Sequence, residues 1–437
     1  MIRRSQSVLR IFICNLLCLE LLLTGCHADS PNNASKAPTQ ITLWAHAGQA
    51  GERETLQGQI TRYNASQQAS QIVVTFIPER TYNSQVQAAA VAGDLPDILE
   101  IDGPYLANYA WQKHLHDLTP LLPAALIEDL LPSIRQQGTY QNTLYGVGSF
   151  DSGLAIYARP SLLKKAGISN IPQHPKQAWT IDKFEQVLVA LSQHDEDGAV
   201  LDVKMNYPDE WFTYAFSPFL QSAGADLIER QRFQSADNQL NNEAAISAMK
   251  HLQLWLQKKW IDLNLDDNAF INGRVALSLS GHWEYQRYHD KWKDDLVLIP
   301  LPDFGKGSKS GQGSWLWSVN QQSQHPAKAS AFIVYLLQTP QILSMCKANG
   351  AVPATKSAIA QSALYNEKGP LHLFVEQLKG GYTIPRPRTP AYPVISASFR
   401  RAIADIRNGG DVKAALDLAV KKIDQDIRDN KGYPRHD

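Results

Sequence analysis

The sequence has few cysteines and no surplus of either charge. Its 437 residues include four cysteines, and its 42 Lys and Arg residues balance its 42 Asp and Glu residues. Nucleic-acid-binding proteins usually carry an excess of basic residues, and this chain has none, so we expect no nucleic-acid partner. Beyond the N-terminal segment, no stretch has about 18 consecutive apolar residues, so no further membrane span is expected.

Sequence signatures of common catalytic sites are also missing. The chain contains no His-Glu-x-x-His, no Gly-x-Ser-x-Gly, no Gly-x-x-x-x-Gly-Lys-Ser/Thr and no Cys-x-x-Cys. His114 and His116 are the nearest approach to a metal pair, but they would share a face only in a strand, and their segment lacks a strand pattern. We predict no metal, no cofactor and no enzyme. Carboxylate pairs of the glycosidase type have no sequence signature and stay open.

The N-terminus has the pattern of a processing signal. Three arginines accompany a mostly apolar stretch over 11–23, which is short for a membrane span. The Leu-Thr-Gly-Cys segment that ends at Cys26 resembles the bacterial lipobox, in which the cysteine becomes the lipidated N-terminus. We predict a lipoprotein signal peptide over 1–25, a lipid on Cys26 and a flexible tether over 26–39. The protein would then be extracytoplasmic, periplasmic or at the cell surface, and anchored in the bilayer. The alternative is an uncleaved apolar anchor.

Cleavage before Cys26 would remove two of the four cysteines, and lipid would occupy the third. Cys346 would remain as the one free thiol, so no intramolecular disulfide is expected. Stability must therefore come from buried apolar surface. The length exceeds what a single hydrophobic core usually organises, and we predict two domains.

Apolar strands alternate with helically spaced segments in the first part of the chain. The predicted order is strand 41–44, helix 52–63, strand 72–77, helix 86–91 and strand 98–101. This alternation predicts α/β units on a largely parallel sheet, whose ligands lie beyond the carboxyl ends of the strands. Trp44, Glu52 and Asp102 follow those ends and are candidate ligand contacts.

A second α/β region begins near Asp151. It contains predicted strands at 154–157 and 275–279 and a helix over 179–191 with Thr180 as its N-cap. Asp411 is predicted to cap a final amphipathic helix.

Several short segments carry a family resemblance through their order and spacing. They are Ile41-Thr42-Leu43-Trp44, Gly93-Asp94-Leu95-Pro96-Asp97-Ile98, Leu144-Tyr145-Gly146-Val147, Leu162-Leu163-Lys164-Lys165-Ala166-Gly167-Ile168, Phe270-Ile271-Asn272-Gly273-Arg274-Val275-Ala276, Gly281-His282-Trp283, Gly313-Ser314-Trp315 and Gly350-Ala351-Val352-Pro353-Ala354. Together they resemble the family 1 extracellular solute-binding proteins, which include maltose- and trehalose-binding components of ABC importers. Gly148 departs from the proline usual in that family.

The resemblance implies an α/β, two-lobe periplasmic-binding-protein fold of type II, with discontinuous lobes joined by a hinge. We expect the chain to cross between lobes near Phe150, Ser314 and Val352. Lobe 1 would comprise 40–150 and 315–352, and lobe 2 would comprise 151–314 and 353–437. The ligand would lie in the cleft between them.

A sugar needs aromatic platforms for its C–H faces and planar polar groups for its hydroxyls, and the chain has 10 Trp and 16 Tyr. The predicted ligand contacts are Trp44, Glu52, Asp102, Asp151, Trp211, Trp283, Trp315 and Arg386. Structural roles compete with these: a helix cap for Asp102, a turn bonded to its own backbone for Asp151, core packing for the tryptophans and a rigid solvated loop for Arg386.

These observations predict the substrate-binding component of an ABC importer, which captures a di- or oligosaccharide and delivers it to the permease. The expected partners are the sugar, the permease subunits in the membrane and the bilayer through Cys26, and a monomer is expected. One alternative is a same-fold binder of glycerol phosphate, a polyamine or a peptide. The other is a secreted enzyme that acts on saccharides.

Overall fold

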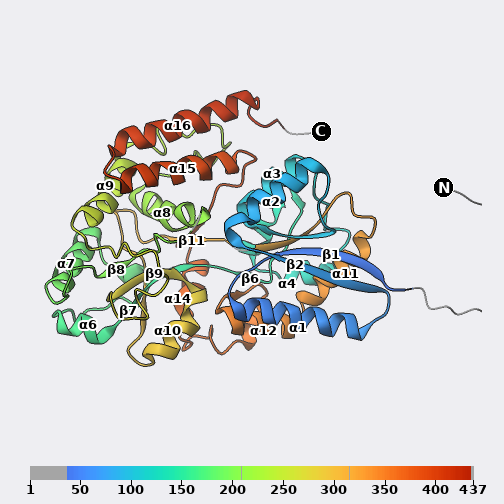
Figure 1. The fold of residues 1–437 in the computed structure, drawn as a ribbon, viewed down its shortest axis with the longest axis horizontal. Helices are drawn as coiled ribbons and strands as arrows, with labels where there is room; N and C mark the ends of the chain where they lie inside the picture. Colours follow the sequence, from blue (N-terminus) through green and yellow to red (C-terminus); the bar gives the residue numbers. More distant parts are fainter. Residues whose placement is uncertain (1–36, 208, 314, 435–437) are drawn as a thin grey trace, which may run out of the picture. The chain divides into compact units, whose positions relative to one another are not determined.

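The computed structural model describes residues 37–207, 209–313 and 315–434. The predicted signal peptide, Cys26 and the crossing at Ser314 lie outside the described residues. Two four-stranded sheets, each with its own helices, lie in different halves of the unit Pro38–Asp437, and β6 and β11 run between them (Figure 1).

The first sheet has the strand order β12-β3-β1-β2. The three strands predicted from the first part of the sequence are confirmed and run parallel, while β12 is antiparallel to β3. Residues of β1 alternate between buried and exposed, because Ile41, Leu43 and Ala45 face the core. The strands are β1 (Thr39–His46), β2 (Ser70–Ile77), β3 (Ile98–Asp102) and β12 (Trp315–Val319). The helices packed with them are α1 (Ala50–Ser66), α2 (Glu79–Ala92), α3 (Leu106–Trp111), α4 (Ala124–Asp129), α5 (Pro132–Gln137), α11 (Pro326–Leu336), α12 (Thr339–Asn349) and α13 (Lys356–Gln361).

The second sheet has the order β10-β7-β9-β8 and is not largely parallel. Strand β7 is antiparallel to both of its neighbours, and only β8 and β9 pair in parallel. The parallel sheet was predicted only for the first part of the chain, and the spacing of strands along the second part does not reveal the direction of β7. The strands are β7 (Leu154–Ala158), β8 (Leu201–Asp202), β9 (Leu277–Gly281) and β10 (Val297–Ile299). The helices are α6 (Pro160–Lys165), α7 (Ile181–Ser192), α8 (Glu210–Ala223), α9 (Glu243–Gln257), α10 (Tyr285–Trp292), α14 (His372–Lys379), α15 (Tyr392–Arg407) and α16 (Val412–Asp429).

Both predicted helix caps in this half are present. The Thr180 hydroxyl accepts a hydrogen bond from the backbone N–H of Lys183 at 3.3 Å, so α7 begins at Ile181 and leaves Trp179 outside. The Asp411 carboxylate accepts one from the backbone N–H of Ala414 at 2.8 Å and starts α16.

Three short strand pairs accompany the two sheets. Two of them include the strands that run between the halves: β6 (Phe150–Asp151) pairs with β13 (Val352–Pro353), and β11 (Ser310–Gln312) pairs with β14 (Thr383–Pro385). The third is a hairpin of β4 (Thr139–Tyr140) and β5 (Thr143–Leu144) within the first half. The chain passes from β11 to β12 of the first sheet within three residues. Three 3-10 turns complete the secondary structure: η1 (Gly103–Tyr105), η2 (Pro175–Gln177) and η3 (His282–Glu284). Within the described ranges, no single helix is long and apolar enough to cross a membrane, and α11 with α12 would qualify only as a pair bent by 64°.

Candidate ligand-binding cleft

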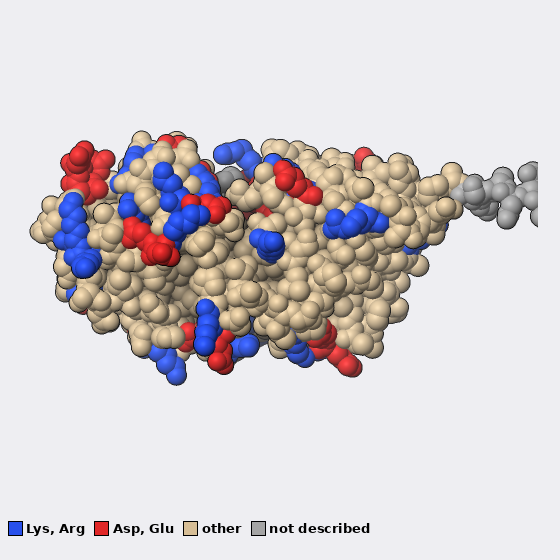
Figure 2. Space-filling model, turned by 90° about the horizontal axis from the view of Figure 1, so that it is seen from below, with Lys and Arg blue, Asp and Glu red and all other residues tan. Residues whose placement is uncertain are grey.

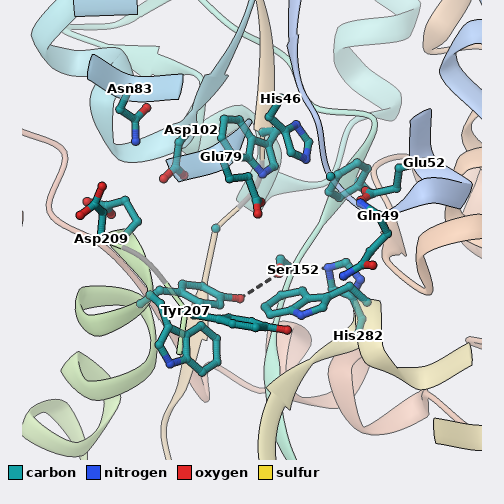
Figure 3. Close-up of a pocket in the computed structure, with 18 of the residues that line it drawn as sticks. His46, Gln49, Glu52, Glu79, Asn83, Asp102, Ser152, Tyr207, Asp209 and His282 are labelled. Carbon is teal, nitrogen blue, oxygen red and sulfur yellow. Dashed lines mark hydrogen bonds between the residues drawn. The ribbon is translucent and has the colours of Figure 1, made fainter. Parts of the chain in front are cut away.

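A cavity of about 270 Å³ lies between the two sheets. One side, which we name the polar wall, comes from the ends of β1 and β3 and the starts of α1 and α2, and consists of His46, Gln49, Glu52, Glu79, Asn83 and Asp102. The opposite side, the aromatic wall, comes from η3, α8 and the segment before α8, and consists of Tyr207, Trp211, Tyr214 and Trp283. The close-up shows the labelled polar side chains facing Tyr207, Ser152 and His282 across the cavity (Figure 3).

Arg386 joins the two walls through an ion pair with Asp102. Its Nη2 donates to one Asp102 oxygen at 2.7 Å and its Nη1 to the other at 3.1 Å, while Nη1 also donates to Glu210 at 2.7 Å. Burial raises the pKa of Asp102 to about 6, Arg386 opposes that rise, and Glu210 adds to it. The Asp102 carboxylate is therefore ionised at neutral pH and held in a bidentate, charge-assisted geometry.

The guanidinium of Arg386 fits because residue 313 is glycine. A Cβ atom at Gly313 would lie 2.6 Å from Nη2 of Arg386, closer than non-bonded atoms approach. The guanidinium also lies 5.0 Å from the centre of the Tyr214 ring. Its Nε–H is buried and has no acceptor among the described residues.

His46 is a charged, stacked group at the end of β1. Its Nδ1 lies 2.8 Å from the Glu100 carboxylate, and its ring stacks on Trp315 at 4.0 Å with 3° between the planes. Burial works against a charged imidazolium, but the carboxylates of Glu100, Glu52 and Glu79 together outweigh it and raise the pKa of His46 to about 9. At neutral pH the polar wall therefore presents a cation whose position Glu100 and Trp315 fix.

Trp283 and Tyr207 are the partly exposed rings of the aromatic wall, whereas Trp211 and Tyr214 are buried. The ring centre of Trp283 is 6.1 Å from that of Trp211 and 6.3 Å from that of Tyr214, and Trp211 donates its indole N–H to the carbonyl of Val203 at 2.9 Å. A Cβ at Gly281 would lie 2.0 Å from the Trp283 indole, so glycine is required where β9 ends. Because its neighbours hold the indole, it offers a rigid apolar face to the cavity.

A hydrogen-bond chain crosses the floor of the cavity. Burial lowers the pKa of His282 to about 4, so the ring is neutral at pH 7, and its Nδ1–H donates to the carbonyl of Asn349 at 2.7 Å. Its Nε2 accepts from the Ser152 hydroxyl at 3.1 Å, which in turn accepts from Tyr214 at 2.8 Å. Asn349 also donates to Glu52 at 2.9 Å, so the chain joins the two walls.

Six of the eight predicted ligand contacts line the cavity, and the structure does not bring Trp44 and Asp151 into it. The six are Glu52, Asp102, Trp211, Trp283, Trp315 and Arg386. Trp44 lies two residues before His46 on the same face of β1, so it is about 7 Å from the strand end along the strand. It packs against the hydrophobic cluster that contains Tyr82. Asp151 is fully buried and accepts from the backbone N–H of Ser152 at 2.8 Å and from Gln137 at 3.2 Å. That geometry matches the turn role that competed with ligand contact.

Sequence reasoning missed several lining residues that lie next to predicted ones. His46 follows Trp44 by two residues, Ser152 follows Asp151, Glu210 precedes Trp211 and His282 precedes Trp283. The sequence signals located the right chain segments but did not show which side chain of each segment points into the cavity. Glu79 and Asn83 had no signal, because the start of α2 was placed at residue 86 and not at Glu79.

The lining residues suit recognition of a polar molecule with apolar faces. Carboxylates accept hydroxyl hydrogens, Arg386 donates, and the rings stack. Within the described ranges, no group of three or more His, Cys, Asp or Glu side chains is arranged to hold a metal ion.

Known proteins resemble this chain in sequence and in fold. The chain is 22% identical over 364 residues to an uncharacterized lipoprotein in the oleD 5' region of Streptomyces antibioticus, covering 81% of this chain and 78% of that one. It is 22% identical over 304 residues to the maltodextrin-binding protein MdxE of Bacillus subtilis (strain 168), covering 65% and 68%. The GacH receptor of Streptomyces glaucescens GLA.O, solved unliganded and with acarbose, superposes with a TM-score of 0.75 at 20% identity over 90% of this chain and 98% of that one.

These similarities agree with the architecture of two sheets joined by short connecting strands, and they confirm the two-lobe, type II periplasmic-binding-protein fold. The family model for bacterial extracellular solute-binding proteins matches residues 59–370, which is more than half of the chain. The chain therefore belongs to the bacterial extracellular solute-binding protein family.

Proposed function

We propose that this protein captures a di- or oligosaccharide in the cleft and delivers it to the permease of an ABC importer. The observation that carries the proposal is the pairing of a rigid aromatic wall with a wall of carboxylates and amides across one cavity. A sugar ring has apolar C–H faces and a rim of hydroxyls, and this cavity offers partners for both.

The names of two relatives support a saccharide. MdxE is a maltodextrin-binding protein, and GacH was solved with acarbose. Glycerol phosphate is less well suited, because Arg386 and His46 already face protein carboxylates and the described lining residues include no other cation for a phosphate.

We propose binding without catalysis. The arrangement closest to a nucleophile and its base is Ser152 with His282, at 3.1 Å. The pKa of His282 is lowered to about 4, and its Nδ1–H faces a backbone carbonyl where catalytic histidines commonly face a carboxylate. His282 is therefore a poor base at pH 7. The experiment that tests this point is prolonged incubation with the best-bound saccharide and a search for products.

The membrane connection is part of the same proposal. We propose a lipid on Cys26, a monomeric binding unit, and lobe boundaries near residues 150, 314 and 352. Mass spectrometry of membrane-extracted protein tests the anchor, because an unmodified Cys26 would contradict it.

The deciding experiment is a thermal-shift screen of saccharides, followed by calorimetry of the best ligand. A ligand that binds only the folded state raises stability by RT ln(1 + [L]/Kd). We expect at least one di- or oligosaccharide to stabilise the protein. No response to any saccharide, with a response to an unrelated solute, would overturn the proposal.

A further inference from the structure

The cavity carries more negative than positive charge, although the chain as a whole is neutral. Its lining includes six carboxylate side chains, whereas only Arg386 and the charged His46 are cationic. The six are Glu52, Glu79, Asp102, Asp209, Glu210 and Asp267. On the face shown in Figure 2, by contrast, basic and acidic side chains are interspersed. The negative surplus is thus a local property of the cavity.

Four of these carboxylates already have cationic partners. Asp102 and Glu210 share Arg386. Asp267 accepts from Lys204 at 2.7 Å and from Arg287 at 3.0 Å, and Asp209 pairs with Arg400.

Glu52 and Glu79 have no such cation. Glu52 accepts only from neutral donors, the backbone N–H of Gln49 at 3.0 Å and the amide of Asn349 at 2.9 Å. Glu79 has no hydrogen bond or ion pair with any described residue. The nearest positive group, His46, is engaged by Glu100. The surplus charge therefore lies on the polar wall.

Glu79 points into the cavity from the first turn of α2 (Figure 3). Although much of its side chain is exposed, withdrawal of the carboxylate from water raises its pKa, His46 opposes that rise, and Glu52 and Glu100 add to it. A ligand that fills the cavity would remove more of this water. Desolvating a carboxylate is costly unless a counter-charge or hydrogen bonds replace the water.

We propose that the natural ligand is an amine-bearing saccharide, whose ammonium group lies between Glu79 and Glu52 while a sugar ring stacks on Trp283. The inference rests on the proposed binding of a saccharide and specifies its class. A neutral sugar could satisfy the paired carboxylates through its hydroxyls, but it would leave Glu79 with no positive group other than His46, which Glu100 already engages. An ammonium group supplies that charge, and aromatic faces nearby also attract cations.

Matched sugars test the proposal because each pair differs in one substituent class. Trehalosamine is compared with trehalose, and the chitosan disaccharide with cellobiose, by calorimetry at pH 7 in low and high salt. We expect the amine-bearing member of a bound pair to bind roughly 10-fold tighter, which corresponds to about 1.4 kcal/mol, because its hydrogen bonds to a carboxylate are charge-assisted. The advantage should shrink in high salt. Glu79→Gln should abolish most of it, whereas Glu54→Gln, an exposed carboxylate of α1 outside the lining, should leave it unchanged.

Each other outcome overturns the inference in a distinguishable way. Equal or tighter binding of the neutral member, or an amine advantage that survives Glu79→Gln, rejects the amine but leaves saccharide binding standing. Tighter binding of putrescine than of every sugar rejects the sugar ring and identifies a linear amine as the ligand. Binding of no saccharide in any pair or in the screen overturns the proposed function and this inference together.

Discussion

The two walls of the cavity come from different parts of the fold and carry different types of side chain. The polar wall comes from the parallel strands β1 and β3 and from the helices that follow β1 and β2, where backbone ends and charged side chains converge. The aromatic wall comes from η3, α8 and the segment before α8, next to the mixed second sheet, where rings hold one another in place. The contrast indicates that one wall supplies charge and hydrogen bonds while the other supplies apolar area.

Arg386 connects the two walls, because it forms ion pairs with Asp102 of the polar wall and with Glu210 beside the aromatic wall. Arg386→Met should lower the free energy of unfolding by about 3–5 kcal/mol, since it leaves the buried Asp102 and the partly buried Glu210 without their cation. Urea denaturation measures this loss. Arg388→Met is the matched control, because Arg388 donates only to the backbone carbonyls of Gln136 and Thr139. Equal losses in both variants would contradict the role of the Arg386 pair.

Removal of the indole at residue 283 tests how much the aromatic wall contributes to binding. Trp283→Ala should weaken saccharide binding about 10- to 150-fold, because burial of a large apolar side chain contributes roughly 1.5–3 kcal/mol. Calorimetry with the best saccharide measures the effect. Trp260→Ala removes a partly buried indole outside the lining and should leave affinity unchanged.

The charge on His46 gives the polar wall a pH dependence that the aromatic wall lacks. The pKa of His46 is raised from 6.5 to about 9 in the folded state, so its contribution to stability is complete below pH 6.5 and is lost as pH rises through 9. This loss should amount to on the order of 1–3 kcal/mol. Urea denaturation at pH 6.5 and pH 10 should show a smaller decline for His46→Gln than for the wild-type protein. An identical decline in both would show that other groups cause it.

Crowding at Gly281 tests whether the aromatic wall must be rigid. Gly281→Ala would place a methyl group 2.0 Å from the Trp283 indole and push that ring out of position. We expect a loss of about 1 kcal/mol in binding free energy, roughly fivefold in affinity. Unchanged affinity and unchanged Trp283 fluorescence would mean that the wall adapts to the extra methyl group.

The positions of β1, β2, β3 and α1 followed from sequence, because these strands are apolar runs separated by helically spaced segments, whereas the start of α2 did not. In the second region, strands near 154–157 and 275–279 were also expected, but their relative direction was not, since β7 has an apolar pattern that any buried strand shares. The prediction of ligand contacts had the same limit. Segments near the cavity were identified, but whether Asp151 or Ser152 faces it depends on the turn after β6.

The sequence by itself determined the α/β character, the caps at Thr180 and Asp411, and the segments that reach the cavity, because these depend on local periodicity and on residue type. Tertiary structure decided which charges meet. Asp102 and Arg386 are separated by 284 residues, and their contact exists only because β12 returns to pair with β3 while β14 pairs with β11. The same return brings Trp315 against His46. Side-chain pairing across a cleft depends on strand order and approach distance, which local sequence patterns do not encode.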